Sequence, residues 1–267
     1  MDAPKKRTKA LAGIYLTVIL LLIYLPVIVV IAFSFNTQPK GLMWTGFTTE
    51  WYGKLFSNRQ IMESFGKSLE VAAYSCAIAA VIGTLGAVAL TRSKSKSDAL
   101  VEGVSTLPIM VPEIIIGLSL MTVFSLAGIR SGTLALVLSH ATFCIPYVLL
   151  NVKARLAGLD VSYEEAARDL GAGPLRAFFT IIMPLIAPAI LSGVLLAFAM
   201  SLDDVVISYY MSGPDSTTFP VYVFSKLKTD LPPTINAMST VLLGVTFVTV
   251  AVSRLIKPNE KKEEPQS

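Results

Sequence analysis

Three acidic residues stand inside long apolar runs of the chain, namely Glu113, Asp203 and Asp204. A charged side chain at the centre of a bilayer costs about 2.5–3.5 kcal/mol on insertion scales, so such residues usually face a cavity or a partner. Glu113 follows Pro108 and Pro112. Proline removes a backbone donor and clashes with the carbonyl four residues before it. We therefore expect free polar backbone groups beside the Glu113 carboxylate, where protein or water must line them.

Asp204 belongs to a stripe of small and polar residues with helical spacings. The stripe consists of Gly193, Ala197, Ser201, Asp204 and Ser208. Residues three and four apart share one face of a helix, and small residues on such a face let helices pack closely in a membrane. Asp203 points about 100° away from this stripe. The spacing predicts that Asp204 lies on this small, polar face and that Asp203 points toward Leu196, Met200 and Ile207.

The buried acids have two interpretations. In the structural one, each carboxylate pairs with a buried Arg, Lys or amide of a neighbouring helix. In the functional one, Glu113, Asp204 and Asp203 form a path for a cation, and their oxygens replace the water lost by an ammonium group. An organic polycation suits this chemistry, because it needs acceptors and negative charge rather than a fixed metal cage. The only histidine, His140, also lies in an apolar run, where a hydrogen-bonded packing role is more common than ligand binding.

The apolar runs that carry these residues are long enough to cross a membrane. Of 267 residues, 54% are hydrophobic and only 15% are charged, compared with about 25% charged in a soluble domain. A helix needs about 20 apolar residues to cross the hydrocarbon core, and lipid cannot hydrogen-bond an open strand. Six runs qualify: Leu11–Ser34, Leu69–Thr91, Val104–Ala127, Thr133–Val152, Leu185–Ser208 and Ile235–Ile256. The predicted fold class is an all-α membrane protein, with one membrane domain over residues 1–256 and a charged cytoplasmic tail at residues 257–267. Cys76 and Cys144 fall inside these runs and are predicted to be packing residues.

The distribution of positive charge predicts the orientation. If the N-terminus is cytoplasmic, the inner segments hold 15 of the 22 Lys and Arg residues and the outer segments hold 7. Cytoplasmic loops of membrane proteins carry such an excess, so both termini are predicted to be cytoplasmic. This bias explains the basic composition without a nucleic-acid partner.

The first outer segment, residues 36–67, is rich in aromatic residues. Trp44, Phe47, Trp51 and Phe56 all lie in it. They fit an aromatic belt at the headgroup level. They also fit a short amphipathic helix that begins near residues 48–49 and docks on the membrane face or on a partner.

The segment between the fourth and fifth runs, residues 154–184, is cytoplasmic in this topology. Asp160 or Ser162 can cap a short helix there, with acidic residues in its first turn. Gly171 and then the Gly173-Pro174 pair are expected to end that helix before a second helical stretch begins. The alanines at 166 and 167 offer a small surface that another chain can approach closely.

This segment resembles the signature of the membrane subunits of ABC importers. Glu165, Ala166 and Ala167 are followed at the family spacing by Gly171, Ile181 and Pro184, and only Met183 departs, standing where leucine is usual. Leucine to methionine is a volume-conserving change. The resemblance implies coupling helices that sit in a groove of a cytoplasmic ATPase. The coupling residues that it implies are Glu164, Glu165, Ala166, Ala167, Gly171, Ile181 and Pro184.

Three further segments resemble the spermidine/putrescine permeases within that family. They are Ser34-Phe35-Asn36, residues 140–144 and Leu202-Asp203-Asp204-Val205-Val206. The resemblance implies a type I ABC importer permease in a bacterial inner membrane that moves a polyamine by alternating access. It also implies a cytoplasmic ATPase dimer, a second permease subunit and an external substrate-binding protein as partners. The chain has no Gly-x-x-x-x-Gly-Lys-Ser/Thr loop, so no cofactor of its own is expected, and ATP and Mg²⁺ would be bound by the ATPase. The alternatives are an importer permease for another small substrate and a gradient-driven transporter, which predicts inverted repeats.

Overall fold

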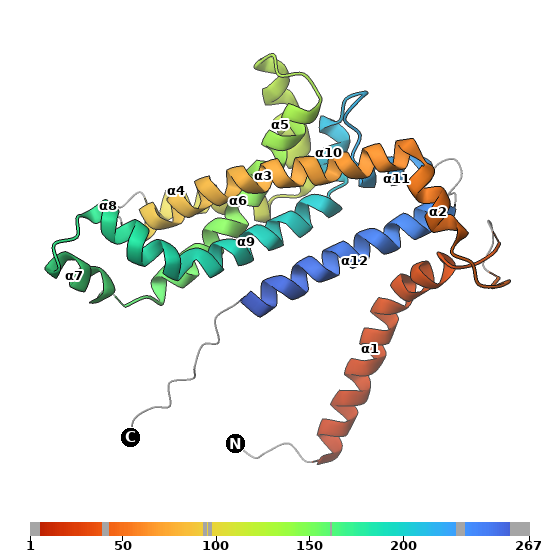
Figure 1. The fold of residues 1–267 in the computed structure, drawn as a ribbon, viewed down its shortest axis with the longest axis horizontal. Helices are drawn as coiled ribbons and strands as arrows, with labels where there is room; N and C mark the ends of the chain where they lie inside the picture. The colour runs from red at the N-terminus through yellow and green to blue at the C-terminus, as the bar shows by residue number, and fades with distance from the viewer. Residues whose placement is uncertain are drawn as a thin grey trace. The chain divides into compact units, whose positions relative to one another are not determined.

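The computed structural model describes residues 6–38, 43–92, 95, 98–160, 162–227 and 233–256. The charged tail predicted at residues 257–267 lies outside them. Within the described part the structure is helical, apart from one isolated antiparallel bridge between Asn36 and Phe47 (Figure 1). The helices are α1 (Lys6–Phe33), α2 (Glu50–Ser57), α3 (Arg59–Arg92), α4 (Asp98–Met110), α5 (Glu113–Leu126), α6 (Thr133–Ala157), α7 (Ser162–Asp169), α8 (Pro174–Ala177), the π-helical turn η1 (Phe178–Ile182), α9 (Met183–Asp203), α10 (Val206–Met211), α11 (Phe219–Leu227) and α12 (Pro233–Ile256).

Five stretches of helix are long and apolar enough to cross a membrane. They are Gly13–Phe33, Arg59–Arg92, Thr133–Ala157, Pro174–Asp203 and Pro233–Val252. The sixth predicted span is present as the pair α4 and α5, which together meet the same criterion but are bent by 111°. The predicted number of about six is confirmed when this pair is counted as one broken span. The disruption that the prolines predict beside Glu113 is present as the break between Met110 and Glu113.

Two other predicted spans have different bounds in the structure. The second begins at Arg59 rather than Leu69, because polar residues extend the helix beyond its apolar part. The fifth begins at Pro174 and ends at Asp203, not at Ser208. Pro184 is therefore the second residue of α9, within a spanning stretch that includes α8 and η1.

The chain divides into two compact units, which are described separately. One unit comprises residues 1–62 and 226–245, and in it Asn36 organises the segment after α1. The Asn36 side chain donates to the Met43 carbonyl at 2.9 Å and accepts from the Thr45 amide at 2.9 Å. The Trp51 indole donates to the Asn36 carbonyl at 2.7 Å. Trp51 and Leu55 are buried on one face of α2, which confirms the predicted short amphipathic helix.

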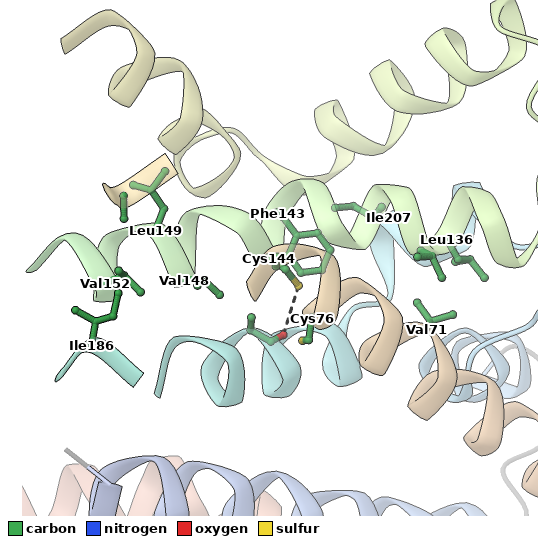
Figure 2. Close-up of a cluster of buried hydrophobic side chains, with 14 of the residues drawn as sticks. Val71, Cys76, Leu136, Phe143, Cys144, Val148, Leu149, Val152, Ile186 and Ile207 are labelled. Carbon is green, nitrogen blue, oxygen red and sulfur yellow. Dashed lines mark hydrogen bonds between the residues drawn. The ribbon is translucent and has the colours of Figure 1, made fainter. Parts of the chain in front are cut away.

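The second unit, residues 63–225 and 246–267, contains the main core. Its buried side chains come largely from α3, α6, α9 and α10 (Figure 2). Glycines let both α3 and α9 approach α6 closely at Val148. A Cβ atom placed on Gly83 would lie 2.9 Å from Val148 Cβ, and one on Gly193 would lie 2.9 Å from Val148 Cα. The close packing predicted from the small-residue stripe that contains Gly193 is confirmed.

Cys76 and Cys144 lie in this core as free, buried cysteines. Figure 2 shows both thiols beside the backbone of α9, and the Cys144 thiol is 3.6 Å from the Ala197 carbonyl. The Cys76 thiol is 3.7 Å from the Val194 carbonyl. Their predicted role as packing residues is confirmed.

Candidate cation path and cytoplasmic loop

A cavity of about 300 Å³ lies where the α4–α5 corner meets α6 and the end of α9. It is lined by Pro108, Ile109, Met110, Val111, Pro112, Glu113, Ile116, Phe143, Tyr147, Met200, Asp204 and Ile207. Two of the three predicted path residues, Glu113 and Asp204, thus face one cavity. Asp203 is not among the lining residues.

The α4–α5 corner places Glu113 at the wall of this cavity. Pro112 has an extended backbone (φ −53°, ψ 132°) that ends the helical path of α4, and its carbonyl accepts hydrogen bonds from the Ile115 and Ile116 amides. Glu113 is the first residue of α5 and is exposed, directly after the break that the prolines predict. The amides and the dipole at a helix N-terminus favour a carboxylate at this position.

Asp204 occupies a second corner, between α9 and α10. The prediction of one continuous helix through Asp204 is wrong, because Asp204 has an extended backbone (φ −66°, ψ 124°). Its carboxylate accepts hydrogen bonds from the Ser208 amide at 2.7 Å and from the Ile207 amide at 3.3 Å. These amides begin α10 and have no partner within that helix, so Asp204 caps it. The stripe of small and polar residues predicted from the sequence is nevertheless buried. Its members are Gly193, Ala197, Ser201, Asp204 and Ser208.

His140 binds the same corner from α6. Its Nδ1 is 2.7 Å from the Ser201 hydroxyl of α9, and its Nε2 is 2.9 Å from the Ser208 hydroxyl of α10. The Nε2 atom is also 3.5 Å from a carboxylate oxygen of Asp204. The predicted role of His140 as a hydrogen-bonded packing residue is confirmed.

The acids therefore differ in how their charge is satisfied. Asp204 is buried and bound to backbone amides and His140, as in the structural interpretation, although no Arg or Lys among the described residues supplies the partner. Glu113 and Asp203 are exposed, and within the described ranges no Lys or Arg nitrogen lies within 4.0 Å of either carboxylate. A carboxylate offers about four acceptor positions, so Asp204 keeps acceptor capacity toward the cavity. Within the described residues, the Glu113 carboxylate keeps most of its hydrogen-bond acceptor positions.

Two aromatic residues of the cavity wall were missed by the sequence analysis. Phe143 and Tyr147 lie four residues apart on α6 and both line the cavity. Aromatic faces attract cations, and the attraction is stronger away from water. In the sequence these residues look like ordinary members of an apolar span, and only their spacing of four from each other gives a weak signal. Only the structure shows that both rings line the same cavity as Glu113.

The segment predicted to be cytoplasmic, residues 154–184, has the predicted order of elements. The Asp160 carboxylate accepts from the Ser162 amide at 2.9 Å, so Asp160 opens α7. This hydrogen bond, with a second from the Ser162 hydroxyl, holds the pKa of Asp160 below its ordinary value. Gly171 closes the helix with φ +79°. Its amide donates to Arg168, and the amide of the next residue donates to the Ala167 carbonyl at 2.9 Å, which is the Schellman pattern.

The residues of the sequence motif in this loop differ in their exposure. Glu165 and Ala166 are exposed, whereas Ala167 is buried within the chain and supports the packing of α7. The side chain of Glu164 lies outside the described part. Ile181 belongs to the π-helical turn η1. Two large apolar residues next to the motif, Leu170 and Leu175, are 89% and 76% exposed.

Comparisons with known proteins identify the family. Residues 79–262 match the binding-protein-dependent transport system inner membrane component family. The chain is 39% identical over 254 residues to the spermidine/putrescine transport system permease protein PotC of Escherichia coli strain K12, covering 95% of this chain and 96% of that protein. It is 40% identical over 248 residues to the putrescine transport system permease protein PotI of the same strain, covering 90% and 88% of the two chains.

Solved structures share the fold at low sequence identity. A bacterial ABC transporter involved in the import of the acidic polysaccharide alginate matches with a TM-score of 0.66 and 16% identity over 97% of this chain and 95% of that one. The MetNI methionine ABC transporter matches with a TM-score of 0.59 and 15% identity over 79% and 98%. The predicted fold of an ABC importer permease is confirmed. The chain belongs to the inner membrane components of binding-protein-dependent transport systems.

Proposed function

We propose that this chain is the permease subunit through which an ABC importer moves a polyamine, such as spermidine or putrescine, across the inner membrane. The single observation that carries the proposal is the cavity that combines Glu113 and Asp204 with the aromatic rings of Phe143 and Tyr147. The names of the relatives PotC and PotI support the same substrate class.

The lining of the cavity suits a chain of ammonium groups and methylene segments. The two carboxylates supply negative charge for an ammonium group, and the aromatic rings supply cation–π attraction. Met110, Met200 and Ile116 offer apolar contact for the methylenes between charges. The importer of the acidic polysaccharide alginate has a similar fold, so the fold does not decide the substrate. The charge of the lining does, because these carboxylates would repel an anion.

Transport requires energy from another subunit. In this proposal an ATPase dimer docks on the cytoplasmic loop, a second permease completes the path, and a binding protein delivers the polyamine outside. ATP and Mg²⁺ are bound by the ATPase. Closure of the ATPase pair moves α7, and the rigid helices beyond it alternate between two arrangements. Both termini are cytoplasmic, in accordance with the excess of Lys and Arg in the inner segments.

The substrate class is tested by uptake into vesicles that contain the complete importer. Labelled spermidine or putrescine should accumulate only when ATP is available to the ATPase side. An excess of an unlabelled polyamine should abolish the signal, whereas an acidic sugar or a neutral amino acid should not. ATP-driven uptake of one of those other solutes, with no uptake of either polyamine, would refute the proposal.

The docking surface on α7 is tested with a charge reversal. Glu165 is exposed, so Glu165→Lys should leave the fold intact. We expect it to reduce co-purification of the ATPase by about tenfold, the effect of losing about 1.4 kcal/mol of binding free energy. Asp215→Lys, an exposed position of the predicted outer side, is the control and should retain the ATPase. Equal retention by both variants would contradict docking at α7.

A further inference from the structure

We infer that His140 is a positioning residue of the cation path: it fixes the α9–α10 corner and, through α10, the place of α5 and Glu113. The inference rests on the proposed function for its transport readout. It assigns a role to a buried group that does not line the cavity itself.

The first step is the connection that His140 makes between three helices. The side chain is fully buried, and it contacts Ser201 of α9 through Nδ1 and Ser208 of α10 through Nε2. A buried polar group that loses its partner is costly, so this arrangement strongly favours one relative placement of α6, α9 and α10. Asp204 lies within the same network and caps α10 through the Ser208 amide.

The second step is the contact between α10 and α5, which lie side by side (Figure 1). A Cβ atom on Gly117 would lie 2.8 Å from the Tyr210 ring and 3.6 Å from Ile207 Cα. A side chain at this position would require the Tyr210 ring to shift, so α5 packs directly against α10. Glu113 lies one turn before Gly117 on the same face of α5. A shift of α10 therefore moves Glu113 relative to Asp204.

The two nitrogens of His140 divide the network into separable halves. Asparagine places its amide near the Nδ1 position and can keep the bond to Ser201, whereas glutamine reaches the Nε2 position and can keep the bond to Ser208. Because α5 packs against α10, the hydrogen bond from His140 to Ser208 is the one that determines the position of Glu113. His140→Gln should therefore preserve the cavity, and His140→Asn should not.

The transport test compares these variants in the complete importer with spermidine as the probe. His140→Asn should raise the KM for uptake about tenfold, as expected for one buried group left without its partner. His140→Gln should stay within about threefold of the wild type, less than half of that free energy. The maximal rate and the basal ATP hydrolysis should change little for both. Ser139→Ala is the control, because the Ser139 hydroxyl is buried on the same helix without a hydrogen-bond partner in the described chain.

A second pair of variants keeps the test decisive if a His140 variant folds poorly. Ser208→Ala removes the α10 half of the network and should reproduce the raised KM, whereas Ser201→Ala removes the α9 half and should not. Equal KM values for the two serine variants, or a loss of folded protein with unchanged KM, would overturn the inference.

A distance measurement separates this inference from the proposed function. Spin labels at Leu118 of α5 and Leu150 of α6, both partly exposed, report the placement of α5 without any cargo. The distance distribution should broaden or shift in Ser208→Ala and stay unchanged in Ser201→Ala. An unchanged distribution in both would refute the role of His140 even if polyamines are transported. Failure of the wild type to transport polyamines, with the expected shift present, would refute only the proposed substrate.

Discussion

Gly83→Ala is expected to weaken the contact between α3 and α6. A Cβ atom at Gly83 would lie 2.9 Å from Val148 Cβ, 3.0 Å from the Ile145 carbonyl oxygen and 3.1 Å from the Leu149 amide nitrogen. Comfortable non-bonded contacts between carbon atoms are about 3.5–4.0 Å, so the two helices must separate by about half an ångström or more. Two of the three neighbours are backbone atoms and cannot rotate away. Overpacking of this kind costs about 1–3 kcal/mol.

Gly66→Ala is the matched control in the same helix. Among the described residues, a Cβ atom at Gly66 would have no neighbour within 4 Å outside the local helix backbone, so this variant gains helix propensity, at most about 1 kcal/mol, without a clash. Gly83→Ala receives the same gain. The difference between the two variants therefore isolates the steric cost.

The unfolding assay can use the native cysteines. Cys76 of α3 and Cys144 of α6 are free and buried, so a thiol-reactive dye reports the loss of this core on heating in mild detergent. A difference of 1–3 kcal/mol corresponds to a Tm for Gly83→Ala that is lower than that of Gly66→Ala by about 2–10 °C for a domain of this size. Equal Tm values, or a higher Tm for Gly83→Ala, would refute the close contact between α3 and α6.

Three further predictions concern the loop at residues 154–184 and the topology. Gly171→Ala should lower substrate-stimulated ATP hydrolysis by the reconstituted importer, because φ +79° costs alanine about 1–2 kcal/mol; wild-type stimulation would contradict this. Hydrogen bonds from Ser162 lower the pKa of Asp160, so its stabilisation of α7 is present above the ordinary pKa and is lost as the pH falls through the lowered value. Spin-label mobility on α7 should rise over that range, and should not rise in Asp160→Asn. An impermeant thiol reagent should label Thr49→Cys from outside and Leu170→Cys only after permeabilisation; the reverse pattern would invert the topology.

The spans were predictable because long apolar runs have few alternatives in a membrane. The ends of these spans were not predictable. The apolar run of α3 begins at Leu69, but the helix begins at Arg59, since hydropathy reports only the part that suits lipid. The α9–α10 corner was missed for a different reason. Residues 202–208 look like a continuing helix, and the break depends on the Asp204 carboxylate competing for the amides of Ile207 and Ser208.

The site was predictable only where the residue type itself was unusual. Glu113 and Asp204 could be selected because an acid in an apolar run needs a reason. Phe143 and Tyr147 could not, because an aromatic residue in a spanning helix is ordinary. The geometry that joins them to Glu113 arises from the 111° bend between α4 and α5. Proline at 112 indicated a disruption there, but it did not specify the angle.

The most direct test of the central claim is the initial rate of ATP-driven spermidine uptake by Glu113→Gln, normalised to folded importer. The variant keeps the shape of the side chain and removes its charge. Asp203→Asn is the matched comparison, since its side chain does not line the cavity. If the cavity carries an organic cation, Glu113→Gln should lose at least about tenfold in uptake, equivalent to about 1.4 kcal/mol, while its Tm stays near that of the wild type and Asp203→Asn loses less. Wild-type uptake by Glu113→Gln would contradict the account.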